Sequence, residues 1–236
     1  MMKKTLFSLI AFIAITATCS EKVFYETSFA KGQWNPKDWT MTKCSRFNYV
    51  GSWVQHDKFI ANVVPKGATD KELQGKYAHK TYTVMTLNKK ISGPCTITST
   101  MEFDYRMAPG LIITLAPMAK IKGQQELRDH LEFILYDEGI NMWHHFFENN
   151  KQRWRKNFYI TDKASFCKKK PYTVTMKLYN TKRGPFIEVK AGKNVAGYYE
   201  PLLFKGEYQI AIVACEGLNR FYDFKVTIPE AKPKKK

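Results

Sequence analysis

The chain has 236 residues, of which 44% are hydrophobic and 14% aromatic, and it carries a formal net charge of +17 at pH 7. This composition excludes an intrinsically disordered protein, and the length suits one large β-sandwich or two small domains. No Gly/Ser/Pro-rich linker divides the interior, so one domain is expected. The positive charge favours an anionic partner, such as a sulfated or uronic-acid glycan, nucleic acid or an anionic envelope.

The N-terminus has the pattern of a bacterial secretory signal. Basic residues precede an apolar run, Thr5–Thr18, which matches a signal-peptide core and is too short for a spanning helix. We expect residues 1–20 to be the signal, with cleavage near Cys19–Glu21 and export to the periplasm, the cell surface or the medium. Anchoring as a lipoprotein through Cys19 is the alternative, which Thr16 and Thr18 disfavour.

Export changes how the basic charge is interpreted. Removing Lys3 and Lys4 with the signal leaves a net charge of +15, and part of it lies in a C-terminal tail, residues 230–236, that we expect to be disordered. The signal and the lack of any nucleic-acid-binding module argue against nucleic acid as the partner. No second apolar run follows, so no transmembrane helix is expected.

Four cysteines remain after the signal: Cys44, Cys95, Cys167 and Cys215. In an oxidising compartment they allow three disulfide pairings, among which the sequence cannot choose. The alternative is that they are buried thiols, and the apolar strand patterns around Cys95 and Cys215 favour this for those two. None of the cysteines has metal-ligand spacing with a histidine, which argues against a zinc site.

Residues 21–229 show strand patterns and no convincing long helix. The patterns fall at 23–29, 53–64 (two short strands), 77–87, 96–107, 111–116, 131–136, 140–147, 172–179, 186–190, 208–214 and 221–228. Many short strands at regular spacing predict a β-sandwich or barrel, and the absence of a fixed repeat argues against a propeller. Residues 111–116 are apolar on both sides, which is typical of a strand covered on both faces.

The aromatic-rich stretch at 131–147 predicts a β-hairpin. Two alternating runs, Leu131–Tyr136 and Ile140–Phe147, flank the turn signal Asp137-Glu138-Gly139. Alternation along the second run places Ile140, Met142, His144 and Phe146 on one face and Asn141, Trp143, His145 and Phe147 on the other. We expect one face to close the core and the other to offer Trp143 and His145 to a ligand.

The layout resembles a known superfamily. A first strand ends at Phe29, a loop contains Trp39, a strand pair follows Gly51-Ser52-Trp53, a long alternating strand covers Thr96–Met107, and Arg220–Val226 form a final strand. This order, over nearly all the mature chain, resembles the concanavalin A-like lectin/glucanase superfamily, near its laminarinase-like and 3-keto-glycoside hydrolase-like members. The resemblance implies an all-β jelly roll of two antiparallel sheets.

The resemblance does not carry catalytic residues to this chain. The Glu-x-Asp-x-x-Glu string of laminarinase-type glycosidases and the Asn-Ser-Gly segment of the 3-keto-glycoside hydrolases are both missing. No cofactor is required, although relatives often hold a structural calcium between the first and last strands. Glu26 and Asp223 occupy comparable places and have suitable oxygen ligands, with an ordinary surface role as the alternative.

In such jelly rolls the ligand lies across the concave sheet, which we expect to combine the polar side of the 96–107 strand with the hairpin. Flat rings and hydrogen-bonding side chains are what sugar recognition needs. The predicted carbohydrate-binding residues are Trp143, His145, Asn141, Glu132, Arg106, Asp104 and Trp154. Arg153 and Arg155 beside Trp154 suit an anionic sugar. The alternatives are that Trp143 and His144 are core residues and that Glu102 and Asp104 are solvated.

Three functions follow, in this order. The first is a secreted, monomeric carbohydrate-binding protein that places a polysaccharide, anionic or neutral, over Trp143 and its neighbours. The second is a glycoside hydrolase that uses Glu132 with Glu102 or Asp104, assisted by His145. The third is an envelope adhesion protein whose basic surface docks on anionic polymers. The sequence names no glycan and does not settle catalysis.

Overall fold

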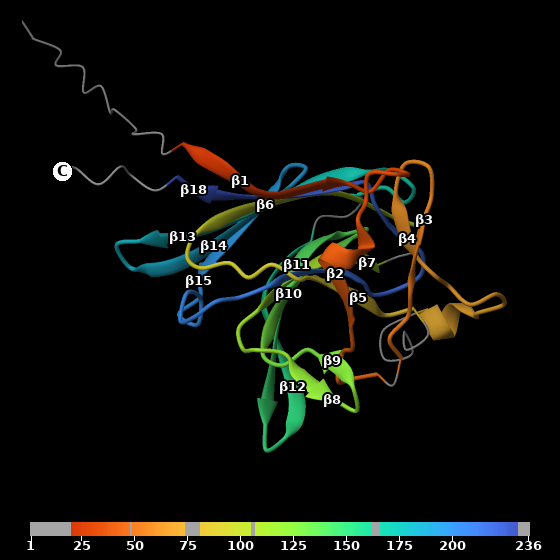
Figure 1. The fold of residues 1–236 in the computed structure, drawn as a ribbon, viewed down its shortest axis with the longest axis horizontal. Coiled ribbons are helices and arrows are strands. Elements are labelled where there is room, and N and C mark those ends of the chain that lie inside the picture. Colours follow the sequence, from red (N-terminus) through yellow and green to blue (C-terminus); the bar gives the residue numbers. More distant parts are fainter. Residues whose placement is uncertain (1–19, 48, 74–80, 105–106, 162–165, 231–236) are drawn as a thin grey trace, which may run out of the picture.

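Two large antiparallel β-sheets packed face to face make up the molecule (Figure 1). The computed structural model describes residues 20–47, 49–73, 81–104, 107–161 and 166–230. Residues 1–19 of the expected secretory signal, including Cys19, and residues 231–236 of the basic tail therefore lie outside the described residues.

The first sheet has nine strands in the order β15-β14-β13-β6-β17-β4-β3, with β18 pairing both β6 and β1. Its strands are β1 (Glu21–Ser28), β3 (Trp53–Gln55), β4 (Ile60–Asn62), β6 (Cys95–Phe103), β13 (Tyr172–Thr181), β14 (Gly184–Ala191), β15 (Asn194–Tyr199), β17 (Asn219–Phe221) and β18 (Asp223–Pro229).

The second sheet has seven strands in the order β12-β11-β10-β7-β16-β5-β2. They are β2 (Trp39–Thr42), β5 (Thr83–Leu87), β7 (Met107–Thr114), β10 (His130–Tyr136), β11 (Gly139–Glu148), β12 (Lys151–Thr161) and β16 (Ile210–Ala214). A separate pair, β8 (Ala119–Ile121) and β9 (Gln124–Glu126), and two 3-10 turns, η1 (Pro36–Asp38) and η2 (Asp70–Leu73), complete the described elements.

The sandwich core lies between the two sheets. Alternation along β6 sends Ile97, Met101 and Phe103 into it, and none of the three is exposed. The predicted doubly covered strand is β7, whose Leu111 and Ile112 are both fully buried although they point to opposite faces. The predicted all-β fold with two antiparallel sheets is thus confirmed.

Some elements differ from the prediction. No strand was predicted for 118–129 or 151–157, but the first stretch contains β8 and β9 and the second belongs to an 11-residue strand, β12. β12 is an edge strand whose residues are mostly exposed or half-buried, so it lacks the apolar alternation that predicts a strand. Figure 1 shows that β11 and β12 extend away from the nine-stranded sheet.

The four cysteines are free thiols: Cys44, Cys95 and Cys215 are buried and Cys167 is exposed. Of the two readings of the sequence, the structure therefore has the one with buried thiols for Cys95 and Cys215. In the described part of the chain, no helix is long and apolar enough to cross a membrane.

Candidate functional site

The outer face of the seven-stranded sheet brings together several polar and aromatic side chains of the hairpin. β10 and β11 form the hairpin, with Tyr136 opposite Gly139, and the register continues so that Glu132 lies opposite Trp143. The next row places His130 opposite His145, which in turn lies opposite Trp154 on β12. Because directly opposite residues project to the same side, this row runs continuously across three strands.

Gly139 allows β11 and β12 to lie close together where the hairpin turns. A Cβ atom at this position would lie 1.8 Å from the carbonyl oxygen of Ile160 on β12. A larger residue would therefore force β11 and β12 apart at the point where the hairpin begins.

Glu132 is the centre of a buried polar group. Its Oε2 lies 2.8 Å from His145 Nε2, and its Oε1 accepts hydrogen bonds of 3.0 Å from the Tyr82 hydroxyl and from the Cys215 thiol. Glu132 is 3% exposed and His145 2% exposed. Each oxygen of the carboxylate thus has a donor, which is what a buried charge requires.

His130 completes this group from the same strand. Its ring stacks on that of His145, with centroids 4.6 Å apart and planes 1° from parallel. His130 Nδ1 lies 2.5 Å from the carbonyl oxygen of Arg128. Since a carbonyl can only accept, Nδ1 carries the proton, and in the neutral ring Nε2 then carries a lone pair.

The electrostatics of the group follow from burial and from these contacts. Burial alone would raise the pKa of Glu132, but the adjacent His145, through its charge and its hydrogen bond, lowers that pKa to about 2. Burial, with the charge of His145 added, lowers the pKa of His130 to about 3. Burial and the Glu132 carboxylate raise the pKa of the Cys215 thiol well above its usual range. The group therefore contains an ionised carboxylate, a neutral His130 and a protonated thiol.

A second apolar cluster covers this face of the sheet. The segment after β2 contributes Cys44 and Phe47, and the Phe47 ring packs 5.1 Å from that of Tyr82, the residue that donates to Glu132. The cluster consists of Cys44, Phe47, Tyr82, Val84, Ile112, Leu127, Ile134, Tyr136, Ala211, Val213 and Cys215, with Tyr49, Met118 and Trp143 at its edge.

This cover corrects the expectation of an open concave face. Glu132, His145 and Asn141 were predicted to contact sugar, but each is less than 5% exposed because the second apolar cluster lies over them. Trp143 is half-buried against the same cluster, and the ammonium group of Lys156 lies 4.9 Å from its ring centroid. His144 is buried on the opposite face, where it was expected as a core residue.

The exposed part of the row opens into a cleft of about 620 Å³, which we call the Trp154 cleft. Trp154 is 50% exposed, and the guanidinium of Arg46 lies 4.8 Å from its ring centroid. Arg128 lies 3.6 Å over the ring of Phe147 on the same cleft. The lining residues are Ser45, Arg46, Phe47, Glu126, Arg128, Phe147, Asn150, Lys151, Gln152 and Trp154.

The predicted rim of Arg153 and Arg155 is wrong. Side chains alternate along β12, so these two point away from the face that carries Trp154. Arg153 pairs with Glu148 at 3.6 Å, and Arg155 lies 6.0 Å over Phe146. Arg46 from another part of the chain takes their place beside the tryptophan.

The predicted contribution of the 96–107 strand to the site is also wrong. β6 belongs to the nine-stranded sheet, so Glu102 and Asp104 lie in the other layer from Glu132. Arg220 binds both, with Nη1 2.6 Å from Glu102 Oε1 and Nη2 2.9 Å from Asp104 Oδ2. Arg106 lies outside the described residues.

The two carboxylates considered for calcium have protein partners. Glu26 pairs with Lys225 at 3.2 Å, and Asp223 Oδ1 accepts a 2.7 Å hydrogen bond from the backbone N–H of Thr100. A structural calcium ion at Glu26 and Asp223 stays a prediction.

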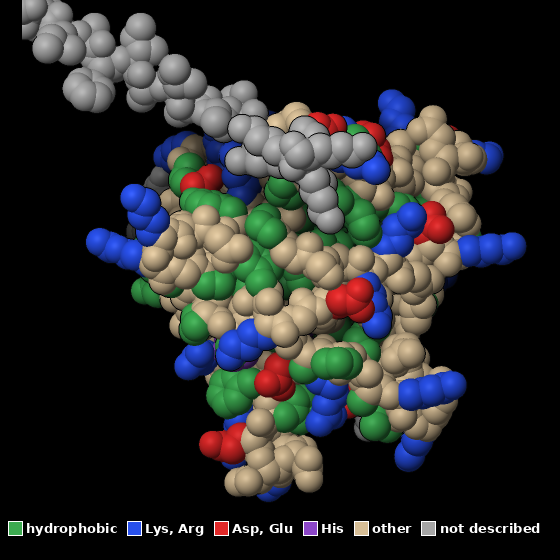
Figure 2. Space-filling view, turned by 60° about the vertical axis from the view of Figure 1, so that its left-hand side comes forward, with side chains coloured by type: hydrophobic (Ala, Val, Ile, Leu, Met, Phe, Trp, Pro, Cys, Tyr) green, Lys and Arg blue, Asp and Glu red, His purple; other side chains and the backbone are tan. Residues whose placement is uncertain are grey.

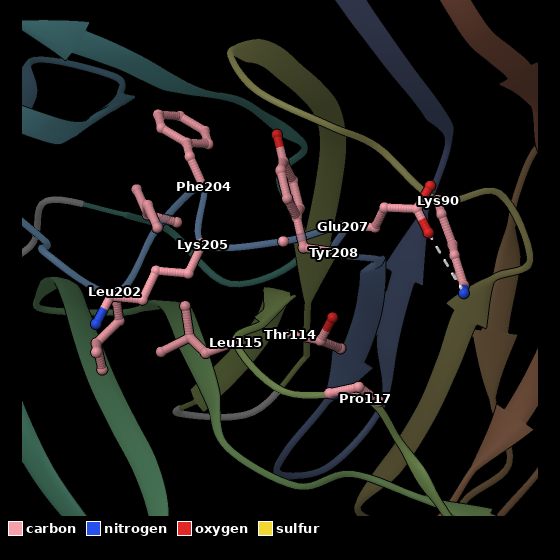
Figure 3. A pocket seen from close by; sticks show the side chains of 11 residues that line it. Lys90, Thr114, Leu115, Pro117, Leu202, Phe204, Lys205, Glu207 and Tyr208 are labelled. Carbon is pink, nitrogen blue, oxygen red and sulfur yellow. Dashed lines mark ion pairs between the residues drawn. The ribbon is translucent and has the colours of Figure 1, made fainter.

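Another cavity, of about 310 Å³, lies between the end of β7 and the segment 202–208 (Figure 3). Two of its three charged groups are paired, because Lys90 and Glu207 form a 3.5 Å ion pair along one side. The Tyr208 hydroxyl donates a 2.6 Å hydrogen bond to the carbonyl of Gly93. The Trp154 cleft offers more exposed aromatic surface and more cations, and it is the better candidate site.

Sequence reasoning missed four residues that matter here: His130, Arg46, Arg128 and Phe147. His130 could have been found from the hairpin register. The two arginines meet Phe147 only because two separate segments line the cleft at the end of the hairpin. One follows β2 and carries Arg46, and the other precedes β10 and carries Arg128.

Comparison with solved structures identifies the fold. The carbohydrate binding module CBM66 from Bacillus subtilis aligns over 81% of this chain and 96% of its own, with 9% identity and a TM-score of 0.52. Beta-agarase A from Zobellia galactanivorans aligns over 90% and 94%, with 9% identity and a TM-score of 0.59. The kappa-carrageenase from Pseudoalteromonas carrageenovora aligns over 94% and 100%, with 9% identity and a TM-score of 0.52.

No protein-family model matches the chain, and no curated protein sequence matches it. The structural matches show that the chain has the concanavalin A-like lectin/glucanase fold, as its layout predicted. Carbohydrate-binding modules, lectins and glycoside hydrolases share this fold, and beta-agarase A and the kappa-carrageenase were solved with bound oligosaccharides. At this level of identity the likeness concerns the fold alone.

Proposed function

We propose that the protein is an exported carbohydrate-binding protein that holds an anionic polysaccharide in the Trp154 cleft. The observation that carries the proposal is a half-exposed tryptophan flanked by cations in a cleft at the end of the hairpin sheet. An exposed indole covers the apolar C–H face of a sugar ring, and guanidinium groups bind sulfate or carboxylate in a bidentate manner.

The charge of the cleft favours an anionic over a neutral glycan. Three lining residues are cationic, Arg46, Arg128 and Lys151, and one is acidic, Glu126. Glu126 is already bound by Lys43 at 3.5 Å and by Arg128 at 3.6 Å. Arg46 and Lys151 therefore remain as the cations that a bound anion would meet. Figure 2 shows more basic than acidic side chains over one side of the molecule, which would also favour the approach of a polyanion.

The hydrolase alternative has weaker support. A glycosidase needs two carboxyl groups about 5–10 Å apart across the scissile bond, one of them protonated. Glu132 is buried and ionised, and the partners considered for it, Glu102 and Asp104, lie in the other sheet. This removes the one carboxylate pairing that the sequence suggested, so binding without cleavage is the better proposal.

Affinity electrophoresis through gels that contain sulfated galactan, polyuronate or neutral glucan tests the proposal. We expect retardation in one of the anionic gels, and we expect Trp154→Ala to abolish it. Tyr199→Ala is the matched control, since Tyr199 is 45% exposed on β15 of the other sheet. Release of reducing ends, measured in parallel, would revive the hydrolase alternative.

A salt series separates the proposal from simple adhesion. Retardation by every anionic polymer alike, lost with added salt and unchanged in Trp154→Ala, would mean that the net charge alone binds and would refute the cleft. Retention of selectivity for one polymer at moderate salt would support it.

A further inference from the structure

Beneath the second apolar cluster, His130, Glu132 and His145 bring three metal-ligating side chains together. One ligand atom from each lies within 4.8 Å of those of the other two, and all three residues are buried. From this geometry we infer that His130, Glu132 and His145 form a binding site for a divalent transition-metal ion of the zinc type. The inference concerns the buried group alone and does not depend on what the Trp154 cleft binds.

The first argument is the presence of unsatisfied nitrogen atoms. Among the described residues, His130 Nε2 and His145 Nδ1 have no hydrogen-bond partner, although both atoms are fully buried. A buried polar atom without a partner is costly, by about 1–3 kcal/mol. A metal ion bound to both nitrogen atoms and to the neighbouring carboxylate would satisfy them.

The second argument is the orientation of the ligands. The hydrogen bond from His130 Nδ1–H to the Arg128 carbonyl fixes the tautomer that leaves the Nε2 lone pair free, which is how metal-binding histidines are usually held. Tyr82 and Cys215 fix the carboxylate of Glu132 in the same way, through its Oε1. These supporting contacts surround the group before any ion is bound.

The third argument is the donor set and its spacing. Two imidazoles and one carboxylate suit zinc and neighbouring first-row ions and do not suit calcium, which prefers oxygen. Ligand atoms around a tetrahedral zinc ion lie about 3–3.5 Å apart. Because the lone pairs lie in the planes of the two stacked rings, one imidazole must turn out of the stack for both to bind one ion. The two histidines are cross-strand partners, and Glu132 lies two residues from His130 on the same face, so the sheet itself holds the spacing.

Zinc titration of the full chain, produced without a histidine tag and stripped with a chelator, tests the inference. Calorimetry should give one zinc ion per chain, and the melting temperature should rise with zinc. His130→Asn and His145→Asn should each weaken zinc binding at least about 100-fold, since loss of a supporting hydrogen bond alone costs about 10–100-fold. His144→Asn, which changes a buried histidine outside the set, and His56→Asn, which changes an exposed one, should bind zinc as the parent does.

X-ray absorption of the zinc-loaded parent chain keeps the test decisive if the variants fail to fold. Two imidazoles and light oxygen scatterers without sulfur are expected. Sulfur in the first shell would place the ion at the cysteines and overturn the assignment. Absence of zinc binding, or binding that both ligand variants retain, would overturn the site altogether and leave the orphaned nitrogens to water.

Discussion

Replacing Glu132 by leucine in the metal-free chain removes the acceptor on which three buried donors converge. Tyr82, Cys215 and His145 all donate to this carboxylate at 2.8–3.0 Å, and their residues are 3%, 7% and 2% exposed. Because none of the three can turn to solvent, each donor would be left buried without a partner.

The magnitude follows from these contacts. Removing one partner of a buried pair costs about 3–5 kcal/mol, while a buried leucine side chain returns about 1.5–3 kcal/mol of apolar burial. We expect Glu132→Leu to lower the free energy of unfolding by about 2 kcal/mol, a sizeable part of the roughly 5–15 kcal/mol that is typical of whole domains. Glu132→Gln, which keeps an acceptor for Tyr82, should cost less although glutamine is the more polar residue.

Urea unfolding followed by tryptophan fluorescence, with chelator present, measures the effect as a shift of the midpoint at constant slope. The double variant Glu132→Leu/His145→Leu should recover part of the loss, because replacing both partners of a buried pair is often nearly neutral. A Glu132→Leu chain as stable as the parent, or a double variant less stable than the single one, would refute the account of Glu132 as the centre of the group.

Three further changes test other parts of the structure. Gly139→Ala should lower the free energy of unfolding by more than about 1 kcal/mol, because its Cβ would meet a β12 carbonyl. Gly206→Ala is the control, since Gly206 has no positive φ and its Cβ would meet open space, and the melting temperatures of the two variants should differ accordingly. Arg220→Met should lower the free energy of unfolding, measured in urea, by about 2–3 kcal/mol, since Glu102 and Asp104 lose their cation. Unchanged stability would contradict this ion-pair network. Trp154→Ala should cost less than about 1 kcal/mol, and a larger loss would show that Trp154 is structural.

The fold was predictable because alternation is strongest where a strand lies on a core. β6 sends Ile97, Met101 and Phe103 to one side, and β7 is apolar on both, so these strands were evident from the sequence. β12 has no such core side over most of its length, since it is an edge strand beside a cleft. Its basic and aromatic residues lie at the surface, and their pattern therefore predicted no strand.

The candidate site was only partly predictable, and the hairpin shows why. The sequence indicated the turn and separated Ile140 from His145 by face, but Gly139 was assigned to the turn instead of to β11. With Tyr136 paired to Gly139, counting outward along both strands places His130 opposite His145. A turn of two residues would thus have been enough to find the histidine pair. The argument against zinc from the sequence considered only cysteine spacing, and it did not consider this pair.

An alternation pattern cannot predict which part of a sheet face stays exposed to solvent. In this chain the segment that carries Cys44 and Phe47 folds over the middle of the seven-stranded sheet, and Glu132, His130 and His145 are buried beneath it. Trp154, the exposed end of the row that contains His130 and His145, lies one strand further out. The row across β10, β11 and β12 therefore has a buried part, where we infer a metal ion, and a solvent-exposed part, where we propose a glycan. Because His145 is the cross-strand neighbour of Trp154, zinc bound at the buried part would fix the strand that supports the cleft, and its effect on glycan affinity would measure the coupling between them.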